Sequence, residues 1–244
     1  SNATLLHGFA FNNNKIATVM ARKIATPAPL PDAKELMSQL LRQRTTAHAF
    51  RLPLAVADAY CLLYSAYEVE VERRGRTLQM DEDTTRIVGE VAHHLTGPQP
   101  NGLLFCGTTG NGKTTLALAL QNAVEWLRAR GMLPTEFMQY DLDTVRFVEA
   151  RHVAATYKTS KARLMSIGVL AIDDVGTEPA EVVDYGNVIE PITELLEARY
   201  ARGLFTLVTT NLTGQELRQR YGVRLVDRMN EMMHVVVFKN GSFR

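Results

Sequence analysis

A glycine-rich run near the middle of the chain has the spacing of a phosphate-binding loop. It reads Gly107-Thr108-Thr109-Gly110-Asn111-Gly112-Lys113-Thr114 and fits the pattern G-x-x-x-x-G-K-[ST]. Glycines let backbone N–H groups turn inward around an anion, and a helix that starts directly after them adds the positive end of its dipole. We expect Lys113 to reach the β- and γ-phosphates and the Thr114 hydroxyl to coordinate Mg²⁺. The alternative is a glycine-rich turn that binds nothing.

The context of this run favours the nucleotide-binding interpretation. An apolar stretch at 102–105 precedes it, as a strand would, and an apolar helical stretch at 116–120 follows it. The residues expected to contact the nucleotide are Gly107, Thr108, Thr109, Gly110, Asn111, Gly112, Lys113, Thr114 and Thr115.

A second apolar run, 169–172, ends in two consecutive carboxylates. We expect Asp173 to hold the metal, directly or through water, and Asp174 to polarise the attacking water as a general base. A switch GTPase would more often have a single Asp followed by Gly at this point, and the guanine motif N-K-x-D does not occur. The sequence therefore favours ATP over GTP.

Two further features could complete a hydrolytic site. Asn211 follows the apolar run 205–210 and could reach the γ-phosphate if that run is a strand beside the P-loop strand; the alternative is a turn or a helix cap. Arg224 and Arg228 are four residues apart and share one face of a helix. One of them could be an arginine finger that completes a neighbour's site, or both could belong to a surface ion-pair helix.

These residues need a scaffold of alternating strands and helices. The sequence predicts strands at 103–106, 137–140, 169–173, 205–209 and 235–238, and helices at about 113–130, 142–155, 184–202 and 213–231. Such alternation predicts an α/β fold with a parallel sheet, helices on both faces, and ligands outside the carboxyl ends of the strands.

The first 97 residues have a different texture. Ser1-Asn2-Ala3, without an initiator Met, resembles the remnant of a cleaved tag, and 4–31 is expected to be a flexible arm that ends in three prolines. Helical spacing predicts helices at 32–44, from Pro53 to about Gly75, and from 81 to about 96. We therefore expect three parts: 1–31, a helical partner-binding region at 32–97, and an ATPase domain at 98–244.

Five segments together resemble the AAA+ ATPases of the DnaC/IstB type, which are bacterial helicase loaders and transposition-linked relatives. The segments are GLLFCGTTGNGKTTLA, VLAIDDVG, TLVTTN, RLVDRM and the closing VVVFKNGSFR. The resemblance covers about 100–244. It implies a P-loop NTPase sheet of order 5-1-4-3-2, assembly into a filament or ring, and ATP sites shared between subunits.

The resemblance also implies roles for single residues. It makes Asp174 the catalytic acid, Asn211 the first sensor, Arg228 the arginine finger with Arg224 as second candidate, and Arg244 a phosphate sensor. Two positions depart from the family pattern, because Thr108 replaces a frequent proline and Thr115 a frequent histidine. The larger helical lid of most AAA+ proteins is missing, so the adenine contacts stay unassigned.

A basic stretch between the second and third predicted strands could bind DNA. It contains Arg151, Lys158, Lys161 and Arg163 with Tyr157 among them, and no acid falls between 150 and 172. By resemblance to the loaders, this region lines a channel for single-stranded DNA, where cations follow phosphates and an aromatic ring stacks on bases. The alternative is a solvated helix face.

Composition bounds these hypotheses. With 244 residues and 46% hydrophobic residues, the chain suits one α/β domain of about 150 residues and a smaller appendage. The 27 Lys and Arg nearly balance the 26 Asp and Glu, so only local patches could favour nucleic acid. The 2 cysteines indicate neither a zinc site nor a disulfide framework, and no apolar run suits a membrane span. We expect a cytoplasmic protein.

The leading hypothesis is an ATP-hydrolysing, Mg²⁺-dependent replication protein that forms homo-oligomers, binds single-stranded DNA and loads a replicative helicase through its N-terminal region. The first alternative is an IstB-like ATPase that regulates a transposase on duplex DNA. The second is an ATP-switched binding module with negligible turnover, which Asp174 disfavours. A small-molecule kinase is also disfavoured, because no Arg-rich lid insertion occurs.

Overall fold

The computed structural model describes residues 31–45, 49–78, 81–98, 100–184 and 186–239, with the side chains of 40–45 and 184 left out. The chain divides into two units, 1–44 and 45–244. The described element of the first is helix α2 (Ala33–Thr45), close to the expected 32–44. The Asp32 carboxylate accepts hydrogen bonds from the backbone N–H groups of Lys34 and Glu35, which fixes where the helix begins. The expected tag remnant and nearly all of the expected arm lie outside the described residues.

The second unit is built on a sheet of five parallel strands. They are β1 (Gly102–Gly107), β2 (Val145–Glu149), β3 (Val169–Val175), β6 (Phe205–Thr210) and β7 (His234–Phe238). Their order across the sheet is β2-β3-β6-β1-β7, and every neighbouring pair is parallel. Numbered along the chain, this is the order 5-1-4-3-2, which confirms the expected P-loop topology.

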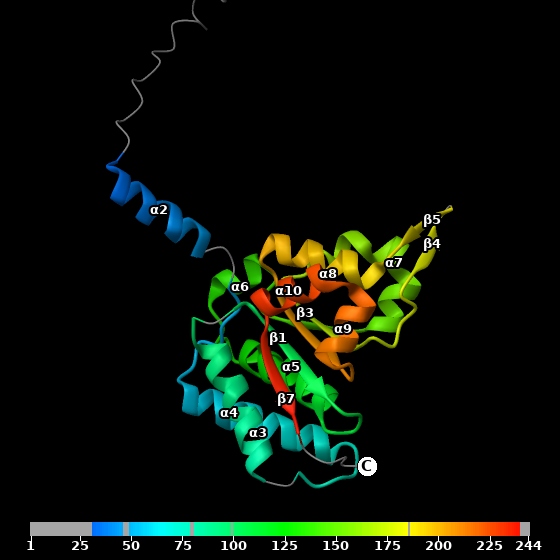
Figure 1. Cartoon of the computed structure of the whole chain (residues 1–244). Coiled ribbons are helices and arrows are strands. Elements are labelled where there is room, and N and C mark those ends of the chain that lie inside the picture. The colour runs from blue at the N-terminus through cyan, green and yellow to red at the C-terminus, as the bar shows by residue number, and fades with distance from the viewer. Residues whose placement is uncertain (1–30, 46–48, 79–80, 99, 185, 240–244) are drawn as a thin grey trace, which may run out of the picture. The chain divides into compact units, whose positions relative to one another are not determined.

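Helices cover both faces of this sheet (Figure 1). One face packs against α3 (Val56–Glu72), α4 (Glu82–Thr96), α5 (Lys113–Ala129) and the short α6 (Thr135–Gln139). The other packs against α7 (Ala150–Leu164), α8 (Pro191–Arg202), α9 (Gly214–Tyr221) and α10 (Val223–Met232). Alternate residues of one strand serve the two cores: Leu103 and Phe105 face α5, whereas Leu104 faces the α10 side.

The expected second strand at 137–140 is wrong. Those residues lie in and just after α6, which begins after Pro134, a residue suited to a helix start. The second strand is β2, inside the segment expected to be helical from 142 to 155, and the helix α7 starts only at Ala150. In β2, Val145 and Phe147 pack on the core beside α5, and Val148 packs on the opposite core, which is the alternation of a strand and not the period of a helix.

Two other expected helices are interrupted. The start of the segment 184–202 belongs to a hairpin, β4 (Val182–Asp184) and β5 (Asn187–Ile189), which projects from the body in Figure 1. Helix α8 begins only at Pro191. The segment 213–231 is broken at Gly222, whose φ of 81° suits glycine and separates α9 from α10.

The predicted boundary at 97–101 does not separate two cores. Helices α3 and α4 share one hydrophobic core with α5 and the sheet. Just before α3, the ring of Phe50 packs edge-on against Phe205 of β6, with ring centroids 4.8 Å apart. The Leu52 N–H donates to the Leu95 carbonyl at 2.8 Å, which joins this segment to the end of α4. The region expected at 32–97 is thus shared between the two units.

Of the described residues, no helix is both long enough and apolar enough to cross a membrane.

Candidate nucleotide-binding site

The glycine-rich run forms a loop between β1 and α5, at the carboxyl edge of the sheet. Gly107, Gly110 and Gly112 have φ values of 146°, 89° and 92°, which side chains disfavour. Gly112 is the N-cap residue of α5, and its position leaves the helix start without a side-chain hydrogen bond from the cap. The first N–H groups of α5 therefore face the loop as donors for an anion.

Lys113 is buried in this loop, with 5% of its surface exposed. Its Nζ donates to the carbonyl oxygens of Gly107 at 2.8 Å and Thr108 at 2.7 Å. It also donates to Asn111 Oδ1 at 3.0 Å and Asn211 Oδ1 at 2.8 Å. Burial lowers the pKa of Lys113. Four oxygens share three N–H donors, so a phosphate oxygen can replace one of them without leaving the ammonium unpaired.

Thr114 and Asp173 contact each other across the site. The Thr114 hydroxyl donates to Asp173 Oδ1 at 2.9 Å, and the Thr209 hydroxyl donates to the same oxygen at 2.6 Å. Burial raises the pKa of Asp173, and these two hydrogen bonds oppose that rise. A hydroxyl and a carboxylate are hard oxygen ligands that suit Mg²⁺, which usually takes few protein ligands and completes its shell with phosphate and water. The predicted metal pair Thr114 and Asp173 therefore fits the ion.

Asp174 has a different environment from Asp173. Its φ is 53°, unusual for a residue with a side chain, and the β3–β6 pairing shifts register between Ile172 and Val175. This bulge lets two consecutive carboxylates serve one site, although side chains in a regular strand point to opposite faces. The Asp174 N–H donates to Thr209 Oγ1 at 2.9 Å, which holds the bulge, and its half-buried carboxylate stays available for water.

Asn211 joins the two sides of the site. It follows β6, which lies between β1 and β3. Its Oδ1 accepts from Lys113, and its Nδ2 lies 3.5 Å from Asp174 Oδ1, the outer limit of a hydrogen bond. The structure thus brings together Lys113, Thr114, Asp173, Asp174 and Asn211, which stand up to 98 positions apart in the sequence. Their catalytic roles stay predictions.

Two residues of the site were missed by the sequence analysis. Thr209 donates to the Asp173 carboxylate and accepts from the Asp174 backbone N–H, and the only sign of it was a pair of threonines at the end of a predicted strand. Glu178 is 3% exposed and accepts from the Gly176 N–H at 2.8 Å and from the Tyr221 hydroxyl. It therefore ties the loop after Asp174 to α9. No spacing rule would have singled it out among the acids of that segment.

The two arginines expected to act on a neighbour's site pair with one residue of their own chain. Glu197 of α8 accepts a hydrogen bond from Arg228 Nη1 and lies 3.9 Å from Arg224 Nε. The Arg228 side chain is 24% exposed and lies over the Tyr200 ring, whereas that of Arg224 is 79% exposed. Arg244, the expected phosphate sensor, lies outside the described residues.

Four of the five residues expected to bind DNA lie on the surface of α7. Arg151, Lys158, Lys161 and Arg163 are exposed. Arg151 donates to the Thr177 carbonyl at 3.1 Å, and Lys161 pairs with Glu194 at 2.7 Å. Tyr157 is 1% exposed and its hydroxyl donates to Glu194 at 3.1 Å. The expected stacking role of Tyr157 does not fit this burial, because its ring belongs to the core between α7 and α8.

Comparison with known proteins identifies the family. The sequence profile described as IstB-like ATP binding protein matches residues 77–244, more than half of the chain. The chain belongs to this family. The match starts before β1 and takes in α4, so the family region extends beyond the resemblance seen from about residue 100.

Solved structures share the fold of this IstB-like protein. The DnaC helicase loader is 23% identical, with 66% of this chain and 93% of that chain covered and a TM-score of 0.50. DnaI is 19% identical, with 68% of this chain and 88% of that chain covered and a TM-score of 0.50. Together with the family match, these likenesses show the AAA+ type of P-loop fold. No curated protein matches the chain in sequence.

Proposed function

We propose that this IstB-like protein hydrolyses ATP with Mg²⁺ at the P-loop. The observation that carries the proposal is the Thr114–Asp173 contact of 2.9 Å beside Lys113 and Asp174. It combines a phosphate-binding lysine, two oxygen ligands for a divalent ion and a second carboxylate for water. Bound Mg²⁺ would neutralise phosphate charge, which is its usual contribution to phosphoryl transfer.

The residues divide the reaction among them. The N–H groups of the loop and Lys113 bind and orient the phosphates, and this positioning is most of what phosphoryl transfer requires. Asp174 accepts a proton from the attacking water as general base. Asn211, between Lys113 and Asp174, orients that water toward the γ-phosphate.

Phosphate release tests this part of the proposal. The full chain with ATP should release inorganic phosphate in the presence of Mg²⁺ and stop when the ion is removed by EDTA. Tight ATP binding without release above the background of the Lys113→Ala variant would instead favour the ATP-switched binding module.

We further propose that the protein binds single-stranded DNA through α7 and delivers a replicative helicase through its N-terminal helices. The four exposed cations of α7 support DNA binding, and Arg151 contacts the loop that follows Asp174. This contact offers a route by which DNA could affect hydrolysis. This protein shares its fold with the DnaC helicase loader, and this likeness suggests the helicase partner.

A loading assay tests the helicase partner. The full chain should bind a purified bacterial replicative helicase and accelerate its arrival on single-stranded DNA in the presence of ATP. A chain shortened to residues 49–244 keeps the second unit almost complete and should lose much of this effect if α2 is part of the contact. Equal helicase binding by both chains would remove α2 from the proposal.

A second candidate function is regulation of a transposase on duplex DNA, which the IstB-like family match favours. The two functions differ in their DNA. Assembly that grows with duplex length, together with stimulation of a transposase, would support the second; ATP-dependent binding confined to single strands would support the first.

A further inference from the structure

Asn111 of the P-loop connects the loop to the edge strand of the sheet. The side chain is 1% exposed. Its Nδ2 donates to the carbonyl of Phe238, the last residue of β7, at 3.0 Å, and its Oδ1 accepts from Lys113 Nζ at 3.0 Å. One amide thus joins the end of β7 to the phosphate-binding ammonium.

The first residue of the loop packs on the same point. Gly107 is the register partner of Phe238. A Cβ on Gly107 would lie 2.4 Å from the Phe238 carbonyl oxygen and 2.6 Å from Asn111 Nδ2, so no side chain fits there. The Phe238 ring is buried and lies 5.2 Å from the Phe105 ring of β1. The loop therefore rests on the end of β7, and a shift of that strand end must move the loop.

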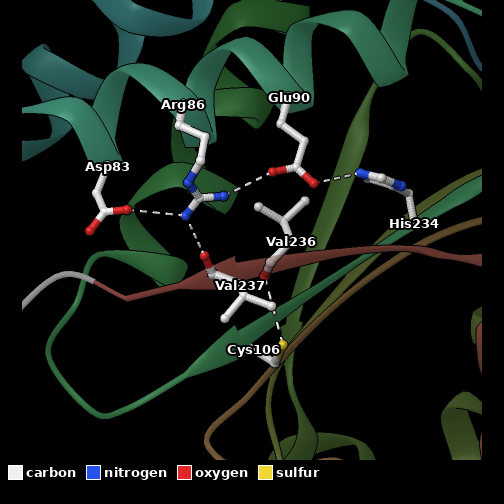
Figure 2. Close-up of polar contacts among 7 residues, drawn as sticks. All are labelled: Asp83, Arg86, Glu90, Cys106, His234, Val236 and Val237. Carbon is white, nitrogen blue, oxygen red and sulfur yellow. Dashed lines mark hydrogen bonds and ion pairs between the residues drawn. The ribbon is translucent and has the colours of Figure 1, made fainter.

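Helix α4 holds the other side of β7, as Figure 2 shows. In the part of the chain that the structure describes, β7 is an outer strand of the sheet and lies beside β1. Arg86 of α4 donates to the Val237 carbonyl at 2.7 Å, and Glu90 pairs with His234 at 2.7 Å. The Arg86 guanidinium is itself held by Glu90 at 3.0 Å and Asp83 at 3.4 Å. α4 thereby fixes both the start and the end of the strand.

We propose that Asn111 is a positioning residue for Lys113, and that α4 sets this position through Arg86 and the end of β7. The inference rests on ATP binding at the P-loop and adds to the proposed function a link between the N-terminal helices and the nucleotide site. The series of contacts is short: Arg86 binds Val237, the next residue is Phe238, and Phe238 binds Asn111.

The physical reason is preorganisation. A loop already held in its anion-binding shape binds phosphate without first losing conformational entropy. Without the Asn111–Phe238 hydrogen bond, the loop samples other conformations. Asn111 Oδ1 then no longer holds the ammonium of Lys113 in one position. The coupling should also act from the nucleotide site toward α4. Phosphate bound in the loop should hold Asn111 in place and so stabilise β7 and its contacts with α4.

The first test replaces Asn111 by Thr and measures the affinity for Mg-ATP in the full chain. A buried hydrogen bond is lost, and the dissociation constant should rise about tenfold. Asn101→Thr is the matched control, because Asn101 also bridges backbone groups, Phe50 N–H and the Gly203 carbonyl, but far from the loop. Both variants should lose stability, and only Asn111→Thr should lose affinity. Asn111→Ser, which is smaller and adds no charge beside the phosphates, keeps the test valid if the threonine variant does not fold.

The second test changes Arg86 of α4, whose described hydrogen bonds go to Asp83, Glu90 and the Val237 carbonyl. Arg86→Ala should raise the dissociation constant for Mg-ATP about threefold. The loss is partial because Arg86 acts on Asn111 only through the end of β7. Arg86→Lys should restore most of the affinity because lysine can still donate to the Val237 carbonyl. Arg73→Ala is the control: Arg73, the residue just after α3, is also an exposed arginine, and it forms an ion pair with Glu70 of that helix. A purely structural role of Arg86 would change the melting temperature and leave affinity untouched.

Hydrogen exchange gives a third measurement. Mg-ATP should slow exchange in the peptides 82–96 and 234–238 of the unaltered protein, and this protection should disappear in Asn111→Thr at saturating ATP. The inference is overturned if ATP protects only the loop and α5, or if Asn111→Thr and Arg86→Ala bind Mg-ATP as tightly as the unaltered protein. Failure of the unaltered protein to bind Mg-ATP at all would instead overturn the proposed function.

Discussion

At the scale of single residues, the two consecutive carboxylates of the site are chemically unequal. Asp173 is 5% exposed and accepts hydrogen bonds from two threonine hydroxyls. Asp174 is half-buried, in a left-handed backbone conformation, and its contact with Asn211 spans 3.5 Å. The fixed carboxylate suits a metal ligand, and the freer one suits a base that must accept a proton.

We therefore expect Asp174→Asn to bind Mg-ATP with nearly unchanged affinity and to hydrolyse it about 100-fold more slowly, the scale of a lost general base. Phosphate release and nucleotide binding, measured on the same preparation, check this. Asp173→Asn is the comparison, since it should weaken Mg-dependent binding itself. Hydrolysis by Asp174→Asn at the rate of the unaltered protein would move the base to another residue.

His94 provides a pH-dependent element of stability. It is 1% exposed, and burial, with a smaller contribution from the stacked His234, lowers its pKa to about 4. The unfolded chain takes up the proton near pH 6.5, whereas the folded protein resists it until about pH 4. The stability contributed by neutral His94 is therefore complete above pH 6.5 and is lost as the pH falls toward 4.

At 1.36 kcal/mol per pK unit, the gap between 6.5 and about 4 corresponds to roughly 3 kcal/mol of unfolding free energy. Urea unfolding of the unaltered protein between pH 7.5 and pH 4.5 should include this loss, and His94→Phe should remove it. His93→Phe, at an exposed neighbouring position, should keep it. An identical pH dependence in both variants would assign the loss to other groups.

The shape of the loop proposed to bind phosphate could be predicted from the sequence because its spacing is set by covalent geometry. A loop of fixed length between a strand and a helix must place Lys113 and Thr114 where the structure has them. Thr209, Glu178 and the Asn111–Phe238 contact could not be predicted, because each depends on a partner far away in the sequence. Tyr157 was misassigned because an aromatic residue among cations has the same local pattern whether its ring is buried or exposed.

At the scale of elements, prediction succeeded for the strands that are continuous apolar runs, the outer strand β7 included. β1, β3 and β6 are continuous apolar runs, and the structure confirms them. β2 is an edge strand with an exposed Arg146, so its apolar content did not distinguish it from a helix. The preceding aromatic run 137–140 was chosen in its place, and Pro134 was the neglected sign of a helix start.

Helix α7 carries the element-scale prediction. If its four exposed cations contact phosphates, affinity for single-stranded DNA should fall with the logarithm of salt concentration at a slope of about −0.7 per contact. Replacing Lys158 and Lys161 by Ala should flatten the slope by about 1.4. Fluorescence anisotropy of a labelled oligonucleotide across a salt series checks this.

The control for α7 is the pair Arg128→Ala and Arg130→Ala near the end of α5, which removes the same charge from another surface. That variant should keep the slope of the unaltered protein. An unchanged slope in the α7 variant would make its cations a solvated face, and equal flattening in both variants would indicate only a dependence on net charge.

At the scale of the whole molecule, the prediction concerns assembly. Arg228 lies on α10, far along the chain from the P-loop, and pairs in its own chain with Glu197. An arginine finger supplied by a neighbour would have to leave this pair for the γ-phosphate. In related phosphoryl-transfer systems such an arginine is worth about 10³ to 10⁵ in rate. Arg228→Ala should therefore bind Mg-ATP almost normally and show little hydrolysis.

Mixing two inactive variants tests whether Arg228 acts in trans. Lys113→Ala has a defective site and an intact Arg228, and Arg228→Ala has the reverse, so some mixed interfaces would join an intact site to an intact finger. Phosphate release should then return in part and depend on the mixing ratio. The same mixture is then made with Arg224→Ala in place of Arg228→Ala. If the more exposed Arg224 is the finger, phosphate release should return in part in that mixture. Mixtures that stay inactive at every ratio, while light scattering shows that the subunits assemble together, would exclude a trans role for Arg228 and leave it as the ion-pair partner of Glu197.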